Sequence, residues 1–227
     1  KNISVKKVIS SPHAMSTINM VKKINHKERK IDIGNRFTQY AFYTGNFARI
    51  EIIPKVLKKL IKYDNLTVDI SENRNDRFNS DEWYLFLKNC KSTLSCESGS
   101  FFLQWNDELR KKINQTVKKD NNISFNNIFR NYLKKSTSYY SGNCVSARHF
   151  DAIACGTCNI LIEGEYNNVF TKDLHFMCLK KNLSNFDEIL EKLSDTKETE
   201  RIAREALRYS IKFHTIQKRI TNLFSKI

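Results

Sequence analysis

Proline and glycine are scarce in this chain: only 2 of its 227 residues are proline and 6 are glycine. Because these two residue types punctuate turns and break helices, their scarcity predicts long regular elements joined by few sharp turns. The sequence also lacks any run of about 18 consecutive apolar residues, which is the signature of a membrane-spanning helix. Hydrophobic residues make up 40% of the chain, with 15 Phe and 9 Tyr, and this composition is typical of a globular protein with a sizeable core.

Positive charge dominates the polar residues. Lys and Arg number 39 against 24 Asp and Glu, which gives a formal charge of +15. Such a surplus is compatible with nucleic acid, an anionic membrane surface or a phosphorylated substrate as partner, and equally with a surface that is simply basic. The chain begins with Lys1, so we expect it to be a piece of a longer protein.

Six cysteines lie in apolar or motif segments, at 90, 96, 144, 155, 158 and 178. We expect buried, reduced thiols, because a chain of this length has a core that needs no disulfides. The spacing Cys155-Gly-Thr-Cys158 also allows a redox pair or half of a zinc site. A zinc site needs two further ligands at suitable spacing, and the remaining cysteines and histidines do not supply them. We therefore favour structural thiols and expect no metal.

Strand and helix patterns alternate along the chain. This alternation predicts an α/β fold with a Rossmann-like parallel sheet flanked by helices, formed by residues 31–227. Residues 1–30 carry eight Lys or Arg against one acid and are expected to form a basic linker or interdomain segment. Strands are expected at 30–36, 66–70, 92–96, 159–162 and 175–179, and helices at 47–63, 81–91, twice within 101–140, before Gly156, at 183–190 and at 198–224.

The segment 146–166 combines a short helix, a glycine and a buried strand. Apolar residues at 150, 153 and 154 follow the i, i+3, i+4 spacing of a helix face. Gly156 stands where helices end in a left-handed residue, a conformation that glycine adopts without steric cost. Asn159-Ile-Leu-Ile162 then has the apolar, β-branched character of a buried strand. The sequence therefore predicts a helix–glycine–strand unit over residues 146–166.

Charged residues near the start of that helix predict a nucleotide site. Arg148 and Asp151 lie one turn apart and share a face. An arginine beside the free N–H groups of a helix start can hold a phosphate, and an acid one turn later can accept hydrogen bonds from a ribose. Ser146 and Ala147 belong to the same helix start, and so does His149, which faces either the ligand or the core.

Two further segments follow predicted strands. Gly34-Asn-Arg36 is expected to form a glycine-containing turn at the end of the first strand, before a helix. Glu97, Ser98, Gly99 and Ser100 form a small-residue turn after the third strand, where doubly wound sheets place ligands. An ordinary tight turn is the alternative for this second segment.

These motifs resemble the C-terminal, donor-binding half of GT-B glycosyltransferases, in particular the group-1 branch that includes the spore-maturation-type enzymes. Its members often have S-P-R-x-F-E-A-x-A-x-G-T, an apolar strand and E-G-x-Y, and E-S-G-S after an earlier strand. Here the first motif is Ser146-Ala-Arg-x-Phe-Asp-Ala-x-Ala-x-Gly-Thr157 and the second is Glu163-Gly-Glu-Tyr166. Ala147 replaces the usual proline and Asp151 the usual glutamate. The resemblance covers roughly residues 30–225.

The resemblance implies a bacterial-type glycosyltransferase that binds a nucleoside-diphosphate sugar for the synthesis of glycans or cell-surface polysaccharide. Gly34 and Arg36 would approach the donor diphosphate. Arg148 would stabilise the leaving group without a metal or other cofactor, which suits the absence of a D-x-D motif. Retaining enzymes of this kind often carry two glutamates eight residues apart. The positions here are Asn143 and Asp151, so retention and inversion both stay open.

The resemblance also bears on partners. In such enzymes the base for the acceptor hydroxyl commonly comes from an N-terminal acceptor-binding domain, which we expect outside this chain, so that the chain alone is an incomplete enzyme. The expected location is cytoplasmic, with a peripheral contact at the inner membrane face. A basic stripe at 201, 204, 208 and 212 is usually a solvated face and otherwise an anionic-membrane contact.

Two other interpretations belong to different functional classes. A basic nucleic-acid-binding module would use the +15 charge and the aromatic and lysine mixture of residues 101–140. We disfavour it, because Phe125, Ile128, Phe129 and Leu133 recur at the spacing of a core stripe. A non-catalytic α/β assembly domain would keep the fold without the site, and the presence of both Arg148 and Asp151 argues against it.

Overall fold

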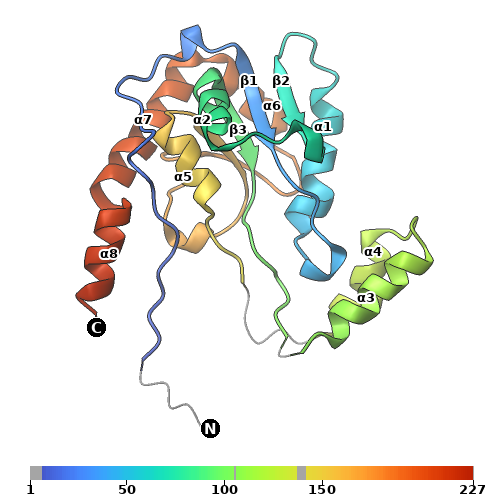
Figure 1. The fold of residues 1–227 in the computed structure, drawn as a ribbon. Helices are drawn as coiled ribbons and strands as arrows, with labels where there is room; N and C mark the ends of the chain where they lie inside the picture. The colour runs from blue at the N-terminus through green and yellow to red at the C-terminus, as the bar shows by residue number, and fades with distance from the viewer. Residues whose placement is uncertain (1–6, 105, 137–141, 227) are drawn as a thin grey trace.

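The computed structural model of the chain describes residues 7–104, 106–136 and 142–226. Its centre is a five-stranded, fully parallel sheet in the order β2-β1-β3-β4-β5 (Figure 1). The strands are β1 (Ile31–Arg36), β2 (Val68–Ser71), β3 (Cys90–Ser95), β4 (Cys158–Ile162) and β5 (Met177–Leu179). The predicted Rossmann-like α/β fold is therefore confirmed.

Strand β1 has β2 and β3 as neighbours: the chain passes from β1 to β2 on one side and then crosses from β2 to β3 on the other side of β1. The connection from β1 to β2 passes over one face and that from β2 to β3 over the other, which creates a topological switch point between β1 and β3. In open parallel sheets, ligands bind in the crevice outside the carboxyl ends of the strands at such a point. The fold alone therefore directs attention to the residues that follow Arg36 and Ser95.

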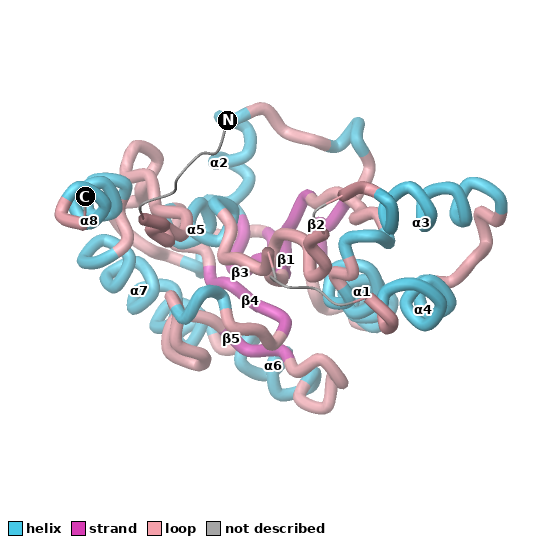
Figure 2. Tube along the Cα trace, turned by 90° about the horizontal axis from the view of Figure 1, so that it is seen from below, coloured by secondary structure: helices cyan, strands magenta, loops and turns pink. Residues whose placement is uncertain are grey.

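Helices cover both faces of the sheet (Figure 2). Helices α1 and α6 pack on one face with Ile160 and Ile162 of β4, whereas Leu161 points to the opposite face with α5. This alternation is the period-2 pattern of a strand that is buried on both sides. The helices that flank the sheet are α1 (Ile53–Leu60), α2 (Ser80–Asn89), α5 (Ala147–Ala154), α6 (Phe186–Ser194) and α7 (Thr196–Phe213), and α8 (Ile216–Phe224) extends beyond α7 (Figure 1).

The helix–glycine–strand unit forms as predicted. Helix α5 ends at Ala154, and Gly156 follows with a φ of 65°. A Cβ at this position would lie 2.6 Å from Cγ1 of Ile24, so both the backbone conformation and the space favour glycine. Every residue of β4 is buried. The unit therefore anchors the centre of the sheet.

One local prediction was wrong, and two predicted helices have different bounds in the structure. Gly34 lies inside β1 and forms no turn: a Cβ there would be 2.3 Å from Sγ of Cys90 and 2.8 Å from Cζ of Phe86. Helix α2 begins at Ser80, one residue before the predicted start, and is capped by Asn79 in a reciprocal capping box with Glu82. The helix around Pro54 is divided into a π-helical turn, η3 (Ala48–Ile52), and α1, whose first turn holds the proline.

Residues 101–104 and 106–136 lie away from the sheet and form a helical arm (Figure 1). The arm contains α3 (Glu108–Lys119), α4 (Phe125–Ile128) and the π-helical turn η5 (Phe129–Leu133). Ile113, Phe125, Ile128 and Leu133 are buried in an apolar cluster of their own, distinct from the sheet core. The predicted apolar stripe is therefore core, and it holds the arm together.

Part of the basic N-terminal segment packs on the domain. Met15 is fully buried and forms a parallel bridge with Thr215, and Val21 N–H donates to Ala154 O at 2.9 Å. The ring of His26 is buried, with Nε2 2.8 Å from Gly156 O. From Met15 onward, these contacts fasten the segment to α5 and to the loop between α7 and α8.

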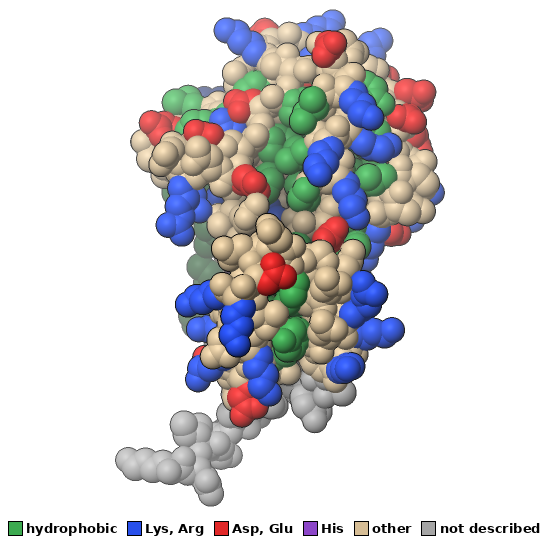
Figure 3. Space-filling view, turned by 90° about the vertical axis from the view of Figure 1, so that its right-hand side faces the viewer, with side chains coloured by type: hydrophobic (Ala, Val, Ile, Leu, Met, Phe, Trp, Pro, Cys, Tyr) green, Lys and Arg blue, Asp and Glu red, His purple; other side chains and the backbone are tan. Residues whose placement is uncertain are grey.

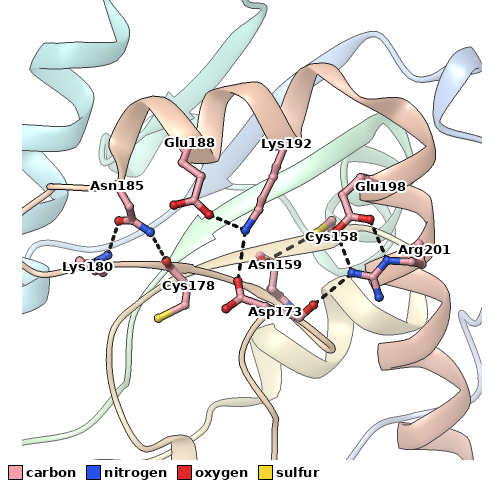
Figure 4. A network of polar contacts seen from close by, with 10 residues as sticks. All are labelled: Cys158, Asn159, Asp173, Cys178, Lys180, Asn185, Glu188, Lys192, Glu198 and Arg201. Atoms are coloured by element: carbon pink, nitrogen blue, oxygen red, sulfur yellow. Dashed lines mark hydrogen bonds and ion pairs between the residues drawn. The ribbon is translucent and has the colours of Figure 1, made fainter.

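Where the sequence predicted helix over 198–224, two helices, α7 and α8, run in series. The basic stripe on α7 is paired with acids: Arg201 with Glu198 at 2.7 Å, Arg204 with Glu200 at 3.5 Å and Arg208 with Glu205 at 3.0 Å. Arg201 also donates to the backbone oxygen of Asp173, and the Asp173 side chain forms an ion pair with Lys192 (Figure 4). These pairs reduce the charge that the stripe offers to a partner. Within the described ranges, no helix is both long and apolar enough to cross a bilayer.

Candidate functional site

The start of α5 reaches the carboxyl edge of the sheet next to β3. Its orientation is set by His149, whose Nδ1 accepts the Ser146 N–H at 3.1 Å and whose Nε2 lies 3.1 Å from Ser95 Oγ. Since Nδ1 accepts from an N–H group, the neutral ring carries its proton on Nε2 and donates to Ser95. Burial, with the nearby charge of Arg49, lowers the pKa of His149 to about 3. His149 is thus a neutral anchor between helix and strand.

Arg148 extends from this helix start over the end of β1. Its Nη1 donates to Arg36 O, and its guanidinium carbon lies 4.9 Å from the centroid of the Trp83 ring. Arg77 approaches from the loop before α2 and donates to Thr38 Oγ1 at 2.9 Å. Together they border a pocket of about 80 Å³ that is lined by Arg36, Phe37, Thr38, Arg77, Phe78, Trp83 and Arg148.

A third arginine, Arg49, was not among the predicted site residues. It lies on the π-helical turn η3, is only 7% exposed, and its guanidinium carbon lies 5.3 Å from the Phe37 ring and 5.2 Å from the Tyr40 ring. Its Nε has no hydrogen-bond partner among the described residues. Arg49 and Tyr40 also line an adjoining hollow of about 360 Å³. A buried guanidinium with an unpaired N–H is costly, which points to an acceptor supplied from outside the chain.

The sequence did contain a signal for Arg49. It stands in register with Ile53, Val56 and Leu60, at i, i+4, i+7 and i+11, and these three residues are buried. A lone arginine on the apolar face of a helix must either be paired or serve a ligand. The position of Arg49 in the sequence therefore predicts either a buried ion pair or a ligand site.

The three arginines form a concentration of unneutralised charge. Within the described part of the chain, none of Arg49, Arg77 and Arg148 makes an ion pair with a carboxylate. Partial burial lowers the pKa of Arg148, and the charges of Arg49 and Arg77 act in the same direction. Mutual repulsion of this kind is relieved when an anion binds between the cations. The arrangement suits a diphosphate, which arginine binds through forked hydrogen bonds.

Arg36 contributes to the pocket in a different way. Its Nη1 lies 2.8 Å from Asp69 Oδ1, and its Nε donates to Asp76 O at 3.0 Å. The guanidinium also lies over the rings of Phe78 and Phe86, at 4.8 and 4.6 Å. These contacts direct the Arg36 side chain to β2 and α2. The part of Arg36 that contacts the site is its carbonyl oxygen, which accepts a hydrogen bond from Arg148.

Asp151 lies one turn further along α5, facing α2. Its Oδ2 accepts from Trp83 Nε1 at 3.2 Å and its Oδ1 from the Tyr84 hydroxyl at 3.1 Å. Burial raises the pKa of the carboxyl, while these two hydrogen bonds act in the opposite direction. The carboxylate therefore joins the two helices, and each oxygen keeps a further lone pair that a ribose hydroxyl could use.

The segment Glu97–Ser100 does not form the expected tight turn. Ser98 pairs with Cys144 in an antiparallel bridge, with both N–H···O distances at 3.0 Å, so the chain continues outward into the arm. Gly99 has a φ of 92°, and a Cβ there would lie 2.0 Å from Gly142 O. Glu97 is 8% exposed and its Oε1 accepts the Tyr166 N–H at 2.8 Å. Glu97 thus links the segments that follow β3 and β4, Ser98 and Ser100 pair with the segment before α5, and none of the four residues lines the arginine pocket.

The Cys155 and Cys158 thiols are free and buried, and burial raises the pKa of each to about 12. Thiolate forms, which redox chemistry and metal binding require, are thus strongly disfavoured at neutral pH. Among the residues that the structure describes, no three His, Cys, Asp or Glu side chains are grouped so that they could hold a metal ion.

Comparisons with known proteins concern the family and the fold of the chain. A family model described as glycosyl transferase-like matches residues 82–225, which is more than half of the chain. The crystal structure of TarM superimposes with a TM-score of 0.57 at 10% sequence identity, and the match covers 97% of this chain and 39% of that chain. At this identity the likeness concerns the fold. No curated protein matches the chain in sequence.

Proposed function

Because this chain belongs to the glycosyl transferase-like family, we propose that it is the donor-binding half of a GT-B glycosyltransferase and that Arg49, Arg77 and Arg148 hold the diphosphate of a nucleotide sugar. The observation that carries the proposal is a group of three arginines without carboxylate partners among the described residues at the switch point of the sheet. Arg77 and Arg148 line the pocket, and Arg49, whose charge acts on Arg148, lines the adjoining hollow. The backbone N–H groups of the first turn of α5 add partial positive charge at the same place.

This arrangement suits the charge that develops in glycosyl transfer. When the bond between the sugar carbon and the terminal phosphate oxygen breaks, the electron pair stays with that oxygen. Fixed cations and helix N–H groups stabilise the resulting charge without having to reorganise. Arg148 lies closest to this role, because its stacking on Trp83 and its bond to Arg36 O hold its guanidinium in one place. Asp151 would bind the ribose of the same donor.

The remaining functions of such an enzyme would come from outside the described site. His149 is neutral and both ring nitrogens are engaged, so it is unsuited to deprotonating an acceptor hydroxyl. The chain spans 39% of the length of TarM. A further domain would accordingly bind the glycan acceptor and provide the base that activates it, in an enzyme of glycan synthesis at the cytoplasmic side.

Thermal unfolding in the presence of UDP, GDP, ADP or CMP tests the proposal. One nucleoside diphosphate should stabilise the chain by about 2.7 kcal/mol at a hundred times its dissociation constant. Arg148→Ala and Arg49→Ala should lose most of that response. Arg130→Ala, in which an exposed arginine of the arm is removed, is the matched control and should keep it.

Two results would contradict this function. Either no nucleotide stabilises the chain, or the arginine variants respond like the wild type. Stabilisation by a DNA duplex that disappears as salt is raised would instead favour the charge-driven nucleic-acid binder.

A further inference from the structure

One edge of the sheet is open. Strand β2 pairs with β1, and among the described residues no strand lies on its other side. Thr67 O accepts from Asp32 N–H at 2.9 Å and Ser71 O from Phe37 N–H at 3.1 Å, so these residues direct their backbone groups toward β1. Since the direction alternates along a strand, the N–H and C=O groups of Val68 and Ile70 point to the open side.

An apolar groove runs beside this edge. Its volume is about 540 Å³, and Ile61 in its wall is 79% exposed. Figure 3 shows this side of the molecule, with apolar side chains gathered in the upper half and basic side chains around them. The groove is lined by Leu57, Leu60, Ile61, Tyr63, Asp64, Leu66, Val68 and Ile70. An open edge next to exposed apolar side chains is an association site unless something covers it.

Basic side chains surround the apolar ones on this side of the molecule (Figure 3). Lys58 of α1 and Lys62 of the turn that follows it are exposed and stand in the segment that lines the groove, and neither makes an ion pair within the described ranges. Asp64 is the one acid in the lining. Unpaired lysines within a Debye length of about 8 Å favour carboxylates in whatever occupies the groove.

We propose that β2 accepts an extended segment of a partner protein as a sixth strand, one in which apolar residues alternate with acidic residues. The N–H and C=O groups of Val68 and Ile70 would pair with its backbone, which gives affinity without sequence dependence. Its apolar side chains would enter the groove over Leu57 and Ile61. Its carboxylates would neutralise the two lysines.

Two other occupants fit less well. A second copy of this chain, paired edge to edge, would bring two sets of Lys58 and Lys62 together, and like charges oppose such a contact. A lipid surface would leave the backbone groups of Val68 and Ile70 without partners in hydrocarbon, which costs several kcal/mol per group. An extended acidic segment satisfies both the backbone groups and the lysines.

Fluorescence anisotropy with a short capped peptide of alternating glutamate and valine tests the proposal. The peptide should bind saturably, and a lysine–valine peptide should not. The double variant Lys58→Glu, Lys62→Glu should weaken binding about tenfold, since each surface ion pair contributes a few-fold. Lys118→Glu with Lys119→Glu, a matched exposed pair on the arm, should leave binding unchanged. In hydrogen exchange, the amides of Val68 and Ile70 should become protected by the peptide.

Several results would overturn the proposal. They are a lack of saturation at about 1 mM peptide, an equal loss in the control variant, or unchanged exchange at Val68 and Ile70. A dimer of the free chain that Ile61→Glu dissociates would assign the groove to a second copy instead. Because Ile61 is exposed, that variant should fold like the wild type.

Discussion

The guanidinium carbon of Arg148 lies 4.9 Å from the centroid of the Trp83 ring, and the indole N–H of the same tryptophan donates to Asp151 Oδ2 at 3.2 Å. One side chain of α2 therefore fixes two residues of α5 that lie one turn apart. The ring holds the cation, and the N–H group holds the carboxylate. These two functions can be separated by substitution.

Trp83→Phe should keep most of the affinity for the nucleoside diphosphate, because a ring remains beneath Arg148. Trp83→Ala should lower the affinity for the nucleoside diphosphate about tenfold, since a partly desolvated cation–π contact contributes about 1–2 kcal/mol. Isothermal titration calorimetry on both variants measures the difference. Equal affinities would show that Arg148 needs no stacking partner to bind the anion.

Two buried arginines should respond in opposite ways to replacement by methionine. Arg49 has an unpaired Nε, and its charge is desolvated without a carboxylate nearby. Arg49→Met should therefore change the free energy of unfolding by less than about 1 kcal/mol, or raise it, because an unpaired buried charge is costly. The stabilisation by nucleotide should disappear.

Arg29→Met is the matched comparison. Its Nη1 donates to Cys90 O and Thr157 Oγ1 at 2.7 and 2.9 Å, and its Nη2 donates to Cys155 O at 2.7 Å. Removal leaves buried acceptors without donors, so stability should fall by about 3–5 kcal/mol in urea unfolding. If both variants lose this much, Arg49 is structural and its unpaired atom marks no anion site.

Sequence periodicity was enough for the sheet and for α5, because both depend on local chemistry. Apolar spacing marked the helix, Gly156 marked its end, and a continuous apolar run marked the buried β4. The same patterns do not determine which groups meet across the fold. Nothing local to Asp151 indicates that Trp83 and Tyr84 occupy its oxygens, since those residues lie on another helix.

Gly34 and Arg36 illustrate the same limit. A glycine near the end of a strand suggests a turn, yet Gly34 is required because Phe86 and Cys90 pack directly against β1. Arg36 suggests a phosphate ligand, yet its guanidinium meets Asp69. Both outcomes depend on how α2 and β2 sit on the sheet, which the sequence does not state. Arg49 differs from these two residues, because its spacing with the buried Ile53, Val56 and Leu60 does mark it in the sequence.

Stability should fall as the pH drops below 6.5. Burial lowers the pKa of His26 to about 4 and that of His149 to about 3, against about 6.5 in the unfolded chain. Between these values the unfolded chain binds more protons, so acidification favours unfolding, by up to about 1.4 kcal/mol per pH unit for each histidine. The effect is absent above about pH 7 and levels off below about pH 4 for His26.

Urea unfolding at a series of pH values measures this slope. His149→Gln should reduce it, whatever its effect on stability at pH 7, and the same change at the exposed His13 should not. His214, whose pKa burial also lowers to about 4, keeps part of the slope in the His149 variant. A slope unaffected by His149→Gln would mean that this ring is protonated in the folded protein.

The arm should unfold independently of the sheet. Ile113 is fully buried, and its cluster excludes the residues of the sheet core. Ile113→Ala should lower the opening free energy of α3 and α4 by about 2–5 kcal/mol, the usual cost of a large cavity. Hydrogen exchange should accelerate there while β3 and β4 stay protected. Ile160→Ala, in the centre of β4, should accelerate exchange throughout.

Nucleotide binding should survive the opening of the arm. The arginines of the site lie on η3, on the loop before α2 and on α5, whereas the arm packs on Phe42, Tyr43 and Ile50 and is paired at Ser98 with Cys144. The Ile113→Ala protein should thus keep the full thermal response to nucleoside diphosphate. If the response were lost along with the arm, the anion would have to contact the arm as well. The hollow beside Arg49, which Ser124 and Phe125 help to line, would then be part of the donor site.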